Sequence, residues 1–476
     1  MHEFSVALPE NLAEAMRCHL ARPDGQEDVC LGLYRPSTGR RRDSAIIYDW
    51  EPPEDGERFV DGSVSFTSEY LRRAIARAAR EHAGVAILHS HLEDATGWQQ
   101  LSPKDFDGER RHARVVHAAV KLPLVGMTLA PGDGTWSARR WLVGPSIQVQ
   151  HAELVRVVGK RLAVSVNPEF AAESQESQVR TVSFWGDLNQ QAIASLTVAI
   201  VGLGSVGSIV AELLARTGVR RLVLIDYDIV KTHNLDRTIT AASGDVGRLK
   251  VEVAAERLRA IATAKHFEVE AVNASVVERD GFTSTLDADV IFSCVDRPWA
   301  RHVLNRASYS HLIPVIDGGI LVLFRPGGQQ MLSANWAVHT SGPGRACLIC
   351  QRAYTTDQVS LEQTGLLESE HYIQGLPDDS PLKRRENVIA LSASVASFEV
   401  LQLVAMVSGL LGLSDPGQQR YSYYPGNVRL EHVTTCEAGC ITSSFLAQGN
   451  QACAGLGVDH ALAALRSQVL TMQSIG

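Results

Sequence analysis

Four of the eight cysteines fall into two close pairs that could hold a metal ion. Two residues separate Cys347 from Cys350, and three separate Cys436 from Cys440. Four thiolates suit a tetrahedral structural zinc site, which leaves no open position for catalysis. The chain does not begin with a positive region followed by an apolar run, so nothing indicates a secretory context that would favour disulfides. We therefore expect bound Zn²⁺, with four unligated core cysteines as the alternative.

A glycine-rich turn upstream of these pairs has the pattern of a nucleotide site. Gly202, Gly204 and Gly207 follow an apolar run at 197–201, and Asp226 comes nineteen positions after Gly207. Glycines let the backbone approach a phosphate, the helix that follows supplies N–H donors, and the acid binds ribose hydroxyls. These residues by themselves favour an NAD-dependent dehydrogenase.

The charged residues that follow the turn favour a different reaction. They come in the order Asp226-Tyr-Asp228, His233-Asn-Leu-Asp-Arg237, Gly247-Arg-Leu-Lys250 and Cys294-Val-Asp296-Arg-Pro-Trp-Ala-Arg301. Over roughly residues 185–445 the chain resembles the ThiF/MoeB superfamily, which includes the ubiquitin-activating (E1-like) enzymes and carries D-x-D, S-N-L-x-R-Q, G-x-x-K and D-N-x-x-x-R in this order. Two positions depart from the pattern, because Arg297 replaces an Asn and Thr238 replaces a Gln. Neither change removes a charged catalytic group.

The resemblance implies ATP-dependent adenylation of a C-terminal carboxylate, whose transition state needs cations and a metal rather than a hydride acceptor. By this resemblance Asp226 holds the ribose and Asp296 binds Mg²⁺. Arg237 and Lys250 bind the phosphates and carry the catalytic charge, while Asn234 helps to position the phosphates. The expected nucleotide-binding set is completed by Gly202, Gly204, Gly207, Asp228 and Arg301. The resemblance also implies that the two cysteine pairs bind zinc at the edge of the nucleotide domain.

Many family members pass the activated carboxyl to a cysteine on a crossover loop, which here would be residues 351–387. That loop contains several hydroxyl side chains but no cysteine. The enzyme could stop at the adenylate, form an oxyester on a loop hydroxyl, or use the more distant Cys453. A hydroxyl is a weaker nucleophile than a thiol and needs an activating base. We favour a loop hydroxyl, with Ser369 and Ser380 as candidates, or no covalent step.

A second group of potential metal ligands lies near the N-terminus. His89-Ser-His91 ends an apolar run and is followed by Ser102-Pro-Lys-Asp105. Two imidazoles and a carboxylate leave one zinc position open, and Glu27 could act as general base toward water. Two ordinary histidines would be the default explanation of a single H-x-H. Here, however, Glu27 precedes the pair, and Ser102 and Asp105 follow it.

This arrangement resembles the JAMM/MPN metalloproteases, which include deubiquitinating isopeptidases. The resemblance implies that Glu27 is the acid/base, that Ser102 stabilises the oxyanion, and that zinc is bound by His89, His91 and Asp105. Ten residues separate His91 from Ser102, where the family usually has about seven, and Leu92 replaces a common Pro. A longer loop can still return the carboxylate to the metal.

Alternating helix and strand patterns place both groups in α/β domains. We expect a JAMM/MPN α/β domain over 1–150, a connector over 151–184, and a Rossmann-like ThiF adenylation domain with structural zinc over 185–476. The first domain should have helices at 9–20 and 67–81 and strands at 28–34, 84–88 and 125–130. The second should have a helix at 206–217 and strands at 197–201, 221–225, 290–294 and 314–317.

Composition narrows the partners and the location. The net charge is −8 and no basic cluster stands out, so no nucleic-acid partner is expected. Residues 388–413 form a long apolar segment, but it contains four serines and Glu399, and its apolar residues recur at helical spacing. This pattern favours a buried core helix over a membrane span. We expect a cytoplasmic protein with no membrane partner.

The two halves act on the same chemical group, the C-terminus of a ubiquitin-like protein. Together they resemble the fused activating-enzyme/deubiquitinase proteins of bacterial ubiquitin-like conjugation operons. The expected partners are a ubiquitin-like protein, a conjugating (E2-like) enzyme and a second copy of the chain in a homodimer. One alternative is sulfur-carrier activation with precursor trimming by the JAMM domain. Another is a non-catalytic scaffold that only binds a ubiquitin-like protein.

Overall fold

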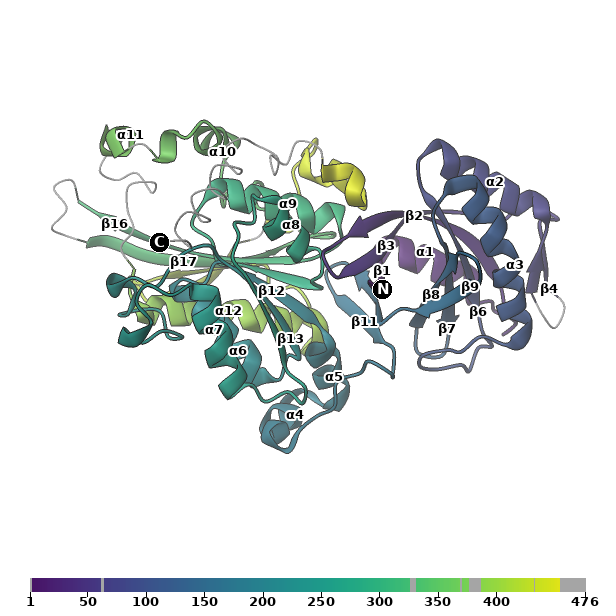
Figure 1. Ribbon diagram of the computed structural model, residues 1–476, viewed down its shortest axis with the longest axis horizontal. Coiled ribbons are helices and arrows are strands. Elements are labelled where there is room, and N and C mark those ends of the chain that lie inside the picture. Colours follow the sequence, from purple (N-terminus) through teal and green to yellow (C-terminus); the bar gives the residue numbers. More distant parts are fainter. Residues whose placement is uncertain are drawn as a thin grey trace. The chain divides into compact units, whose positions relative to one another are not determined.

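The computed structural model describes residues 2–60, 64–325, 331–368, 370–375, 387–431 and 433–453 (Figure 1). The chain forms two compact units, and the described part of the first comprises residues 2–171 with 310–312 and 445–453. The second comprises 172–309 and the described residues of 313–444.

The first unit is built on a nine-stranded mixed sheet with the order β11-β10-β1-β3-β2-β6-β7-β8-β9. Its strands are β1 (Glu3–Pro9), β2 (Val29–Thr38), β3 (Arg42–Glu51), β6 (Gly84–Ser90), β7 (Leu124–Ala130), β8 (Thr135–Val143), β9 (Ile147–His151), β10 (Leu154–Val158) and β11 (Leu162–Val166). A small hairpin of β4 (Arg58–Val60) and β5 (Val64–Phe66) stands apart from it. The helices are α1 (Glu10–Leu20), α2 (Ser68–Arg80) and α3 (Pro103–Val120).

Two apolar cores form on the two faces of this sheet. Met16 and Leu20 of α1 pack with Leu88 of β6 on one face, whereas Tyr70 of α2 packs with Ile87 on the other. Alternate residues of a strand point to opposite faces, so the continuous apolar run of β6 is buried on both. The same alternation puts the side chain after Leu88 on the face that α2 and α3 cover.

The second unit has an eight-stranded sheet with the order β14-β13-β12-β15-β16-β17-β18-β19. Its strands are β12 (Thr197–Val201), β13 (Arg221–Ile225), β14 (Glu268–Val272), β15 (Val290–Ser293), β16 (Val315–Phe324), β17 (Met331–Ser341), β18 (Gln418–Ser422) and β19 (Asn427–Glu431). Strands β12 to β16 pair in parallel, and β16 to β19 pair antiparallel. The strand order reverses direction between β12 and β15, which is where open parallel sheets bind ligands.

Helices cover both faces of the parallel half (Figure 1). α6 (Ser205–Thr217), α7 (Lys250–Ile261) and α12 (Ile389–Ser408) lie on one face, and α8 (Arg279–Thr285) and α9 (Pro298–Ser310) lie on the other. The remaining described α-helices are α4 (Val179–Trp185), α5 (Asp187–Ser195), α10 (Thr356–Gln363) and α11 (Glu370–Gly375). This doubly wound arrangement confirms the predicted Rossmann-like α/β fold.

Residues 151–184 are not the irregular connector that we expected. They begin with β10 and β11, and β10 pairs with β1 inside the first sheet. Leu154, Val155 and Val158 are buried there, so the apolar run was a strand signal. Residues 445–453, expected within the adenylation domain, belong to the first unit.

α12 is the one helix, among the described residues, that is long and apolar enough by composition to cross a membrane. Its mean hydropathy is 1.7, and 44% of the most apolar window is buried. The helix packs against α6, β16 and β17. Ser392, Glu399 and Gln402 are fully or almost fully buried in that packing.

Candidate functional site

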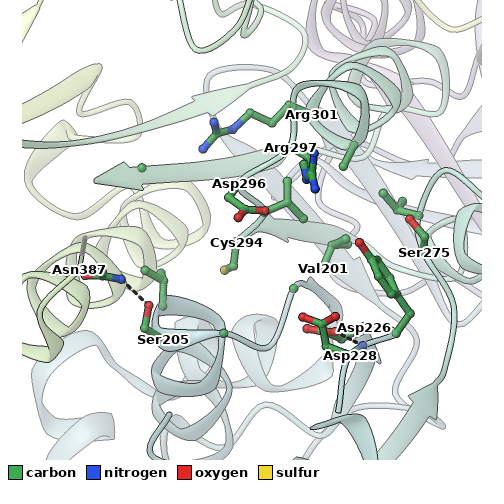
Figure 2. A pocket seen from close by; sticks show the side chains of 18 of the residues that line it. Val201, Ser205, Asp226, Asp228, Ser275, Cys294, Asp296, Arg297, Arg301 and Asn387 are labelled. Atoms are coloured by element: carbon green, nitrogen blue, oxygen red, sulfur yellow. Dashed lines mark hydrogen bonds between the residues drawn. The ribbon is translucent and has the colours of Figure 1, made fainter. Parts of the chain in front are cut away.

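A cavity of about 660 Å³ opens at the carboxyl ends of the parallel strands of the second unit (Figure 2). It brings together side chains from the ends of β12, β13 and β15 and from the crossover region. Nine of the predicted nucleotide-binding residues line it: Gly202, Gly204, Asp226, Asp228, Asn234, Arg237, Lys250, Asp296 and Arg301. The sequence motifs therefore converge on one place, although they are spread over about a hundred residues.

The glycine turn is closely packed, and two of its glycines have no room for a side chain. Gly202 has a φ of +90°, and a Cβ there would lie 2.5 Å from the carbonyl oxygen of Cys294. Gly207, which does not line the cavity, would place a Cβ 1.8 Å from the carbonyl oxygen of Gly202. The N-terminus of α6, which follows this turn, therefore lies at the cavity. The free N–H groups of a helix N-terminus suit a phosphate.

Asp226 ties the turn to the end of β13. Its carboxylate accepts hydrogen bonds from the backbone N–H of Leu203 at 2.6 Å and of Asp228 at 2.8 Å. Burial raises the pKa of this carboxyl, although these bonds and the charge of Lys250 oppose the rise. The residue predicted to hold ribose thus also fixes the shape of the glycine turn.

The cationic side chains of Lys250 and Arg237 each pair with a carboxylate. The ammonium of Lys250 donates to Asp228 at 2.8 Å. Burial acts to lower the pKa of Lys250, but the nearby charges of Asp226 and Asp228 outweigh it and raise that pKa. Arg237 donates to the carbonyl oxygen of His233 at 2.5 Å and pairs with Asp236 at 2.8 Å. Lys250 therefore stays charged at neutral pH.

Arg301 makes hydrogen bonds to β16 that the sequence did not indicate. Its Nε donates to Asp317 at 3.0 Å, and its Nη2 donates to the carbonyl oxygen of Gly318 at 3.3 Å. Asp317 also accepts a 2.6 Å hydrogen bond from Ser293. Asp317, near the start of β16, therefore links Arg301 of α9 to Ser293 at the end of β15, beside the cavity wall.

Two cavity residues that sequence reasoning missed are Ser205 and Asn387. The side-chain amide of Asn387 donates to Ser205 Oγ at 2.6 Å (Figure 2). Ser392 of α12 in turn donates to Asn387 Oδ1 at 3.0 Å. Ser205 lies inside the glycine motif and could have been noticed there, but Asn387 belongs to no motif.

The crossover side of the cavity is lined by Tyr354, Gln358, Leu367 and Ile373. Ser369 and Ser380, the predicted nucleophilic hydroxyls, lie outside the described residues. Cys294 lines the cavity, and burial raises the pKa of its thiol well above the ordinary range. It therefore stays protonated at neutral pH, which makes it a poor nucleophile.

The two cysteine pairs meet in the second unit. The ligand atoms of Cys347, Cys350, Cys436 and Cys440 all lie within 4.8 Å of one another. The sulfurs of Cys347 and Cys440 are 3.6 Å apart. A tetrahedron with Zn–S bonds of about 2.3 Å has sulfur–sulfur edges of about 3.8 Å, so the donors fit zinc.

Backbone N–H groups support these sulfurs as thiolates. The N–H of Cys347 points at the Cys436 sulfur at 3.2 Å, and the N–H of Glu437 points at the Cys350 sulfur at 3.5 Å. The hydrogen bond between Cys347 and Cys436 lowers the pKa of the Cys347 thiol and raises the pKa of the Cys436 thiol. The donor set and its surroundings suit a closed structural site.

The N-terminal ligand group also comes together. The ligand atoms of His89, His91 and Asp105 lie within 4.8 Å of one another. His89 is buried at the end of β6, and burial lowers its pKa to about 3, so the imidazole is neutral as a metal ligand must be. Ser102 caps α3 by accepting from the Asp105 N–H at 3.2 Å, and its hydroxyl donates to Asp105 Oδ2 at 2.5 Å.

Glu27 is half-buried just before β2 and lies beside this group. Burial raises the pKa of Glu27, the charge of Asp105 adds to the rise, and the charge of Lys104 opposes it. The backbone N–H of the next residue, Asp28, donates a hydrogen bond to Ser90 Oγ at 2.9 Å. The start of β2 is thereby fixed next to the end of β6.

Comparisons with known proteins agree with the geometry of the second unit. The model of the ThiF family matches residues 176–468, which is more than half of the chain. Ubiquitin-like modifier-activating enzyme 5 of Drosophila willistoni is 34% identical over 140 residues, covering 27% of this chain and 34% of that protein. Molybdopterin-synthase adenylyltransferase of Escherichia coli K12 is 28% identical over 179 residues, covering 37% of this chain and 68% of that protein.

The similarity to these relatives is partial. The chain spans about a third of the length of the modifier-activating enzymes that it matches. Among solved structures, E. coli MccB with ATP has a TM-score of 0.44 at 17% identity, covering 57% of this chain and 75% of that chain. The family match covers most of the nucleotide unit, and the chain belongs to the ThiF family.

Proposed function

We propose that this protein adenylates the C-terminal carboxylate of a ubiquitin-like protein with ATP and that its first unit is a zinc peptidase acting on the same C-terminus. The observation that carries the first activity is the cavity in which Lys250, Arg237 and Asp296 converge at the N-terminus of α6. Two cations, a carboxylate and free backbone N–H groups suit a nucleoside triphosphate and its metal.

In the proposed reaction, a carboxylate oxygen of the carrier attacks the α-phosphorus of ATP. The new bond gives an acyl adenylate, the bond to the bridging oxygen breaks, and pyrophosphate leaves with its electron pair. Lys250 and Arg237 counter the charge that spreads over the phosphate oxygens, and Asn234 keeps the phosphates in line. Asp296 would hold Mg²⁺, which supplies further charge neutralisation when bound.

The step after adenylation goes through oxygen or directly to an acceptor. Residues 351–387 contain no cysteine, and the buried thiol of Cys294 is held in its protonated form. Ser369 and Ser380 remain the loop hydroxyls to test, with Cys453 ranked behind them. The product then passes to a conjugating (E2-like) enzyme, and the nucleotide units pair in a homodimer in the cytoplasm.

The cysteine cluster would hold a structural zinc ion, since all four ligand positions are filled by the chain. It anchors the segment after β19 to the segment after β17. Because no position is left open, we assign it no catalytic step.

The proposed peptidase rests on the juxtaposition of His89, His91 and Asp105 with Glu27. His89, His91 and Asp105 would hold Zn²⁺, which acts as a Lewis acid on the scissile carbonyl when bound. Glu27 takes the proton from the attacking water and returns it to the leaving amine, and Ser102 stabilises the oxyanion.

Carrier-dependent exchange of pyrophosphate into ATP tests the adenylation. The purified full chain is incubated with ATP, labelled pyrophosphate and a ubiquitin-like protein ending in an exposed glycine. Exchange that requires the carrier supports the proposal, and exchange that is absent with every candidate carrier supports the scaffold alternative. Mass spectrometry with and without hydroxylamine then reveals any ester and the residue that bears it.

Sulfur-carrier activation is a second candidate, supported by the similarity to molybdopterin-synthase adenylyltransferase. It predicts a thiocarboxylate at the carrier C-terminus when a sulfur donor is supplied. Conjugation instead predicts the carrier attached to another protein. The mass of the carrier after the reaction separates the two.

A further inference from the structure

The loop between His91 and α3 is longer than the JAMM/MPN pattern, and the structure shows how the extra residues are held. Its backbone is pinned to the turn after β7, because the N–H of Gly132 donates to the carbonyl oxygen of Ala95 at 2.9 Å. The N–H of Gly97 donates to Asp133 Oδ2 at 2.8 Å. Trp98 packs against the core on the α1 face of the sheet. The loop is thus built into the unit.

The fixed loop orients one polar side chain, Gln99, toward the ligand group. Gln99 Nε2 donates to the carbonyl oxygens of Thr96 at 2.8 Å and of Gly97 at 3.0 Å. Only the amide nitrogen can face two carbonyl oxygens, so the assignment of the amide atoms is settled by these bonds. Gln99 Oε1 must then be the atom that faces Nδ1 of His91, at 2.7 Å.

An amide oxygen can only accept a hydrogen bond, so the His91 Nδ1 that faces it must carry a proton. In a neutral imidazole the other nitrogen, Nε2, is then unprotonated and available to a metal. We propose that Gln99 is a positioning residue of the zinc site, which selects the tautomer of His91 and holds its ring. This inference rests on the proposed peptidase site and adds a function for the long loop.

Partners that orient metal-bound histidines typically change metal affinity by about 10–100-fold when they are removed. Gln99→Ala should therefore weaken zinc binding at this site by about 10–100-fold. Gln99→Glu keeps an acceptor oxygen toward Nδ1 but loses the Nε2 donor that orients the side chain, so it should retain part of the affinity and bind zinc more tightly than Gln99→Ala. Gln100→Ala is the matched control, since Gln100 is an exposed neighbour of the same type, and should bind zinc like the wild type.

The experiment titrates the full-length chain with Zn²⁺ against a chromophoric chelator and uses His91→Ala to define this site. In parallel, ¹⁵N NMR of the metal-free chain reports the tautomer of His91, which a purely structural role of Gln99 would not change. The expected result is an Nδ1–H tautomer in the wild type and in Gln99→Glu, and a loss of that preference in Gln99→Ala. A thermal melt checks that each variant is folded.

Two results would overturn the inference, and they differ from one another. If zinc binding depends on His91 but is unchanged in Gln99→Ala, the role of Gln99 is wrong and the zinc site stands. If His91→Ala binds as much zinc as the wild type, the proposed zinc site fails, and the role of Gln99 toward it fails too.

Discussion

The side-chain amide of Asn387 donates a 2.6 Å hydrogen bond to Ser205 Oγ, although 182 positions separate the two residues. The bond joins a residue two positions before α12 to the first residue of α6. Because α6 begins at the glycine turn, this bond connects the segment that precedes α12 to the predicted phosphate site.

We predict that Asn387→Ala slows carrier-dependent pyrophosphate exchange by about fivefold, the worth of one neutral hydrogen bond of about 1 kcal/mol. The exposed Asn427→Ala in β19 is the control and should leave exchange unchanged. Equal exchange rates in both variants would show that the contact does not affect the phosphate site.

Lys250→Ala should reduce exchange by about 10²-fold or more, because a preorganised charge on the transferring phosphoryl group is lost. It also leaves the carboxylates of Asp226 and Asp228 without their nearby cation. Lys265→Ala removes a surface lysine that pairs with Glu173 and should have no effect. Exchange at the wild-type rate in Lys250→Ala would contradict the assignment.

Cys350→Ser should release the structural zinc and destabilise the second unit. In a unit of this size each kcal/mol lost lowers Tm by about 2–4 °C. Zinc content measured by mass spectrometry should fall together with Tm. Cys18→Ser, at an exposed position of α1, should change neither quantity.

Glu27→Gln should abolish cleavage of a ubiquitin-like precursor or conjugate while leaving the zinc content of the first unit intact. The amide keeps the size of the side chain but cannot take a proton from water. The exposed Glu69→Gln in α2 is the control. Cleavage by Glu27→Gln at the wild-type rate would exclude Glu27 as the general base.

Glu399 predicts a dependence of stability on pH. The carboxyl is fully buried in α12, neither of its oxygens has a hydrogen-bond partner in the described part of the chain, and burial raises its pKa well above the ordinary value. A raised pKa means that the folded state binds the proton more tightly, so stability is full below the ordinary glutamate pKa and falls as the pH rises toward the folded one.

Glu399→Gln removes this dependence and should stabilise the protein at neutral pH. The gain over the wild type should grow by about 1.4 kcal/mol per pH unit within that window and vanish below about pH 4. Denaturant unfolding at several pH values measures it, with the exposed Glu252→Gln as control. A gain that does not change with pH would contradict the explanation.

Much of the nucleotide unit could be predicted because its signals are local. The strands at 197–201 and 221–225 are confirmed with their bounds, and the helix predicted at 206–217 starts one residue earlier. In the first unit the helix predicted at 67–81 is found at Ser68–Arg80, and Thr67 caps it by accepting a hydrogen bond from the N–H of Tyr70. Apolar runs and caps depend on neighbouring residues, which a single sequence displays directly.

The parts that were missed depend on contacts between distant residues. Nothing near Asn387 indicates Ser205 as its partner, and nothing near Gln99 indicates that its amide would be oriented by its own loop. The strand at Leu154–Val158 was read as a connector because its partner, β1, lies at the other end of the unit. Such pairings are set by the fold as a whole and have no local pattern.

Residues 445–453 affect the order in which this protein can fold during its synthesis. Asn450 accepts from the backbone N–H of Thr38 and donates to its hydroxyl, each at 3.0 Å. A Cβ on Gly449 would lie 2.4 Å from the carbonyl oxygen of Pro36, so the chain packs closely there. The first unit is therefore completed only after residues 172–444 have been made, because residues 445–453 pack into it.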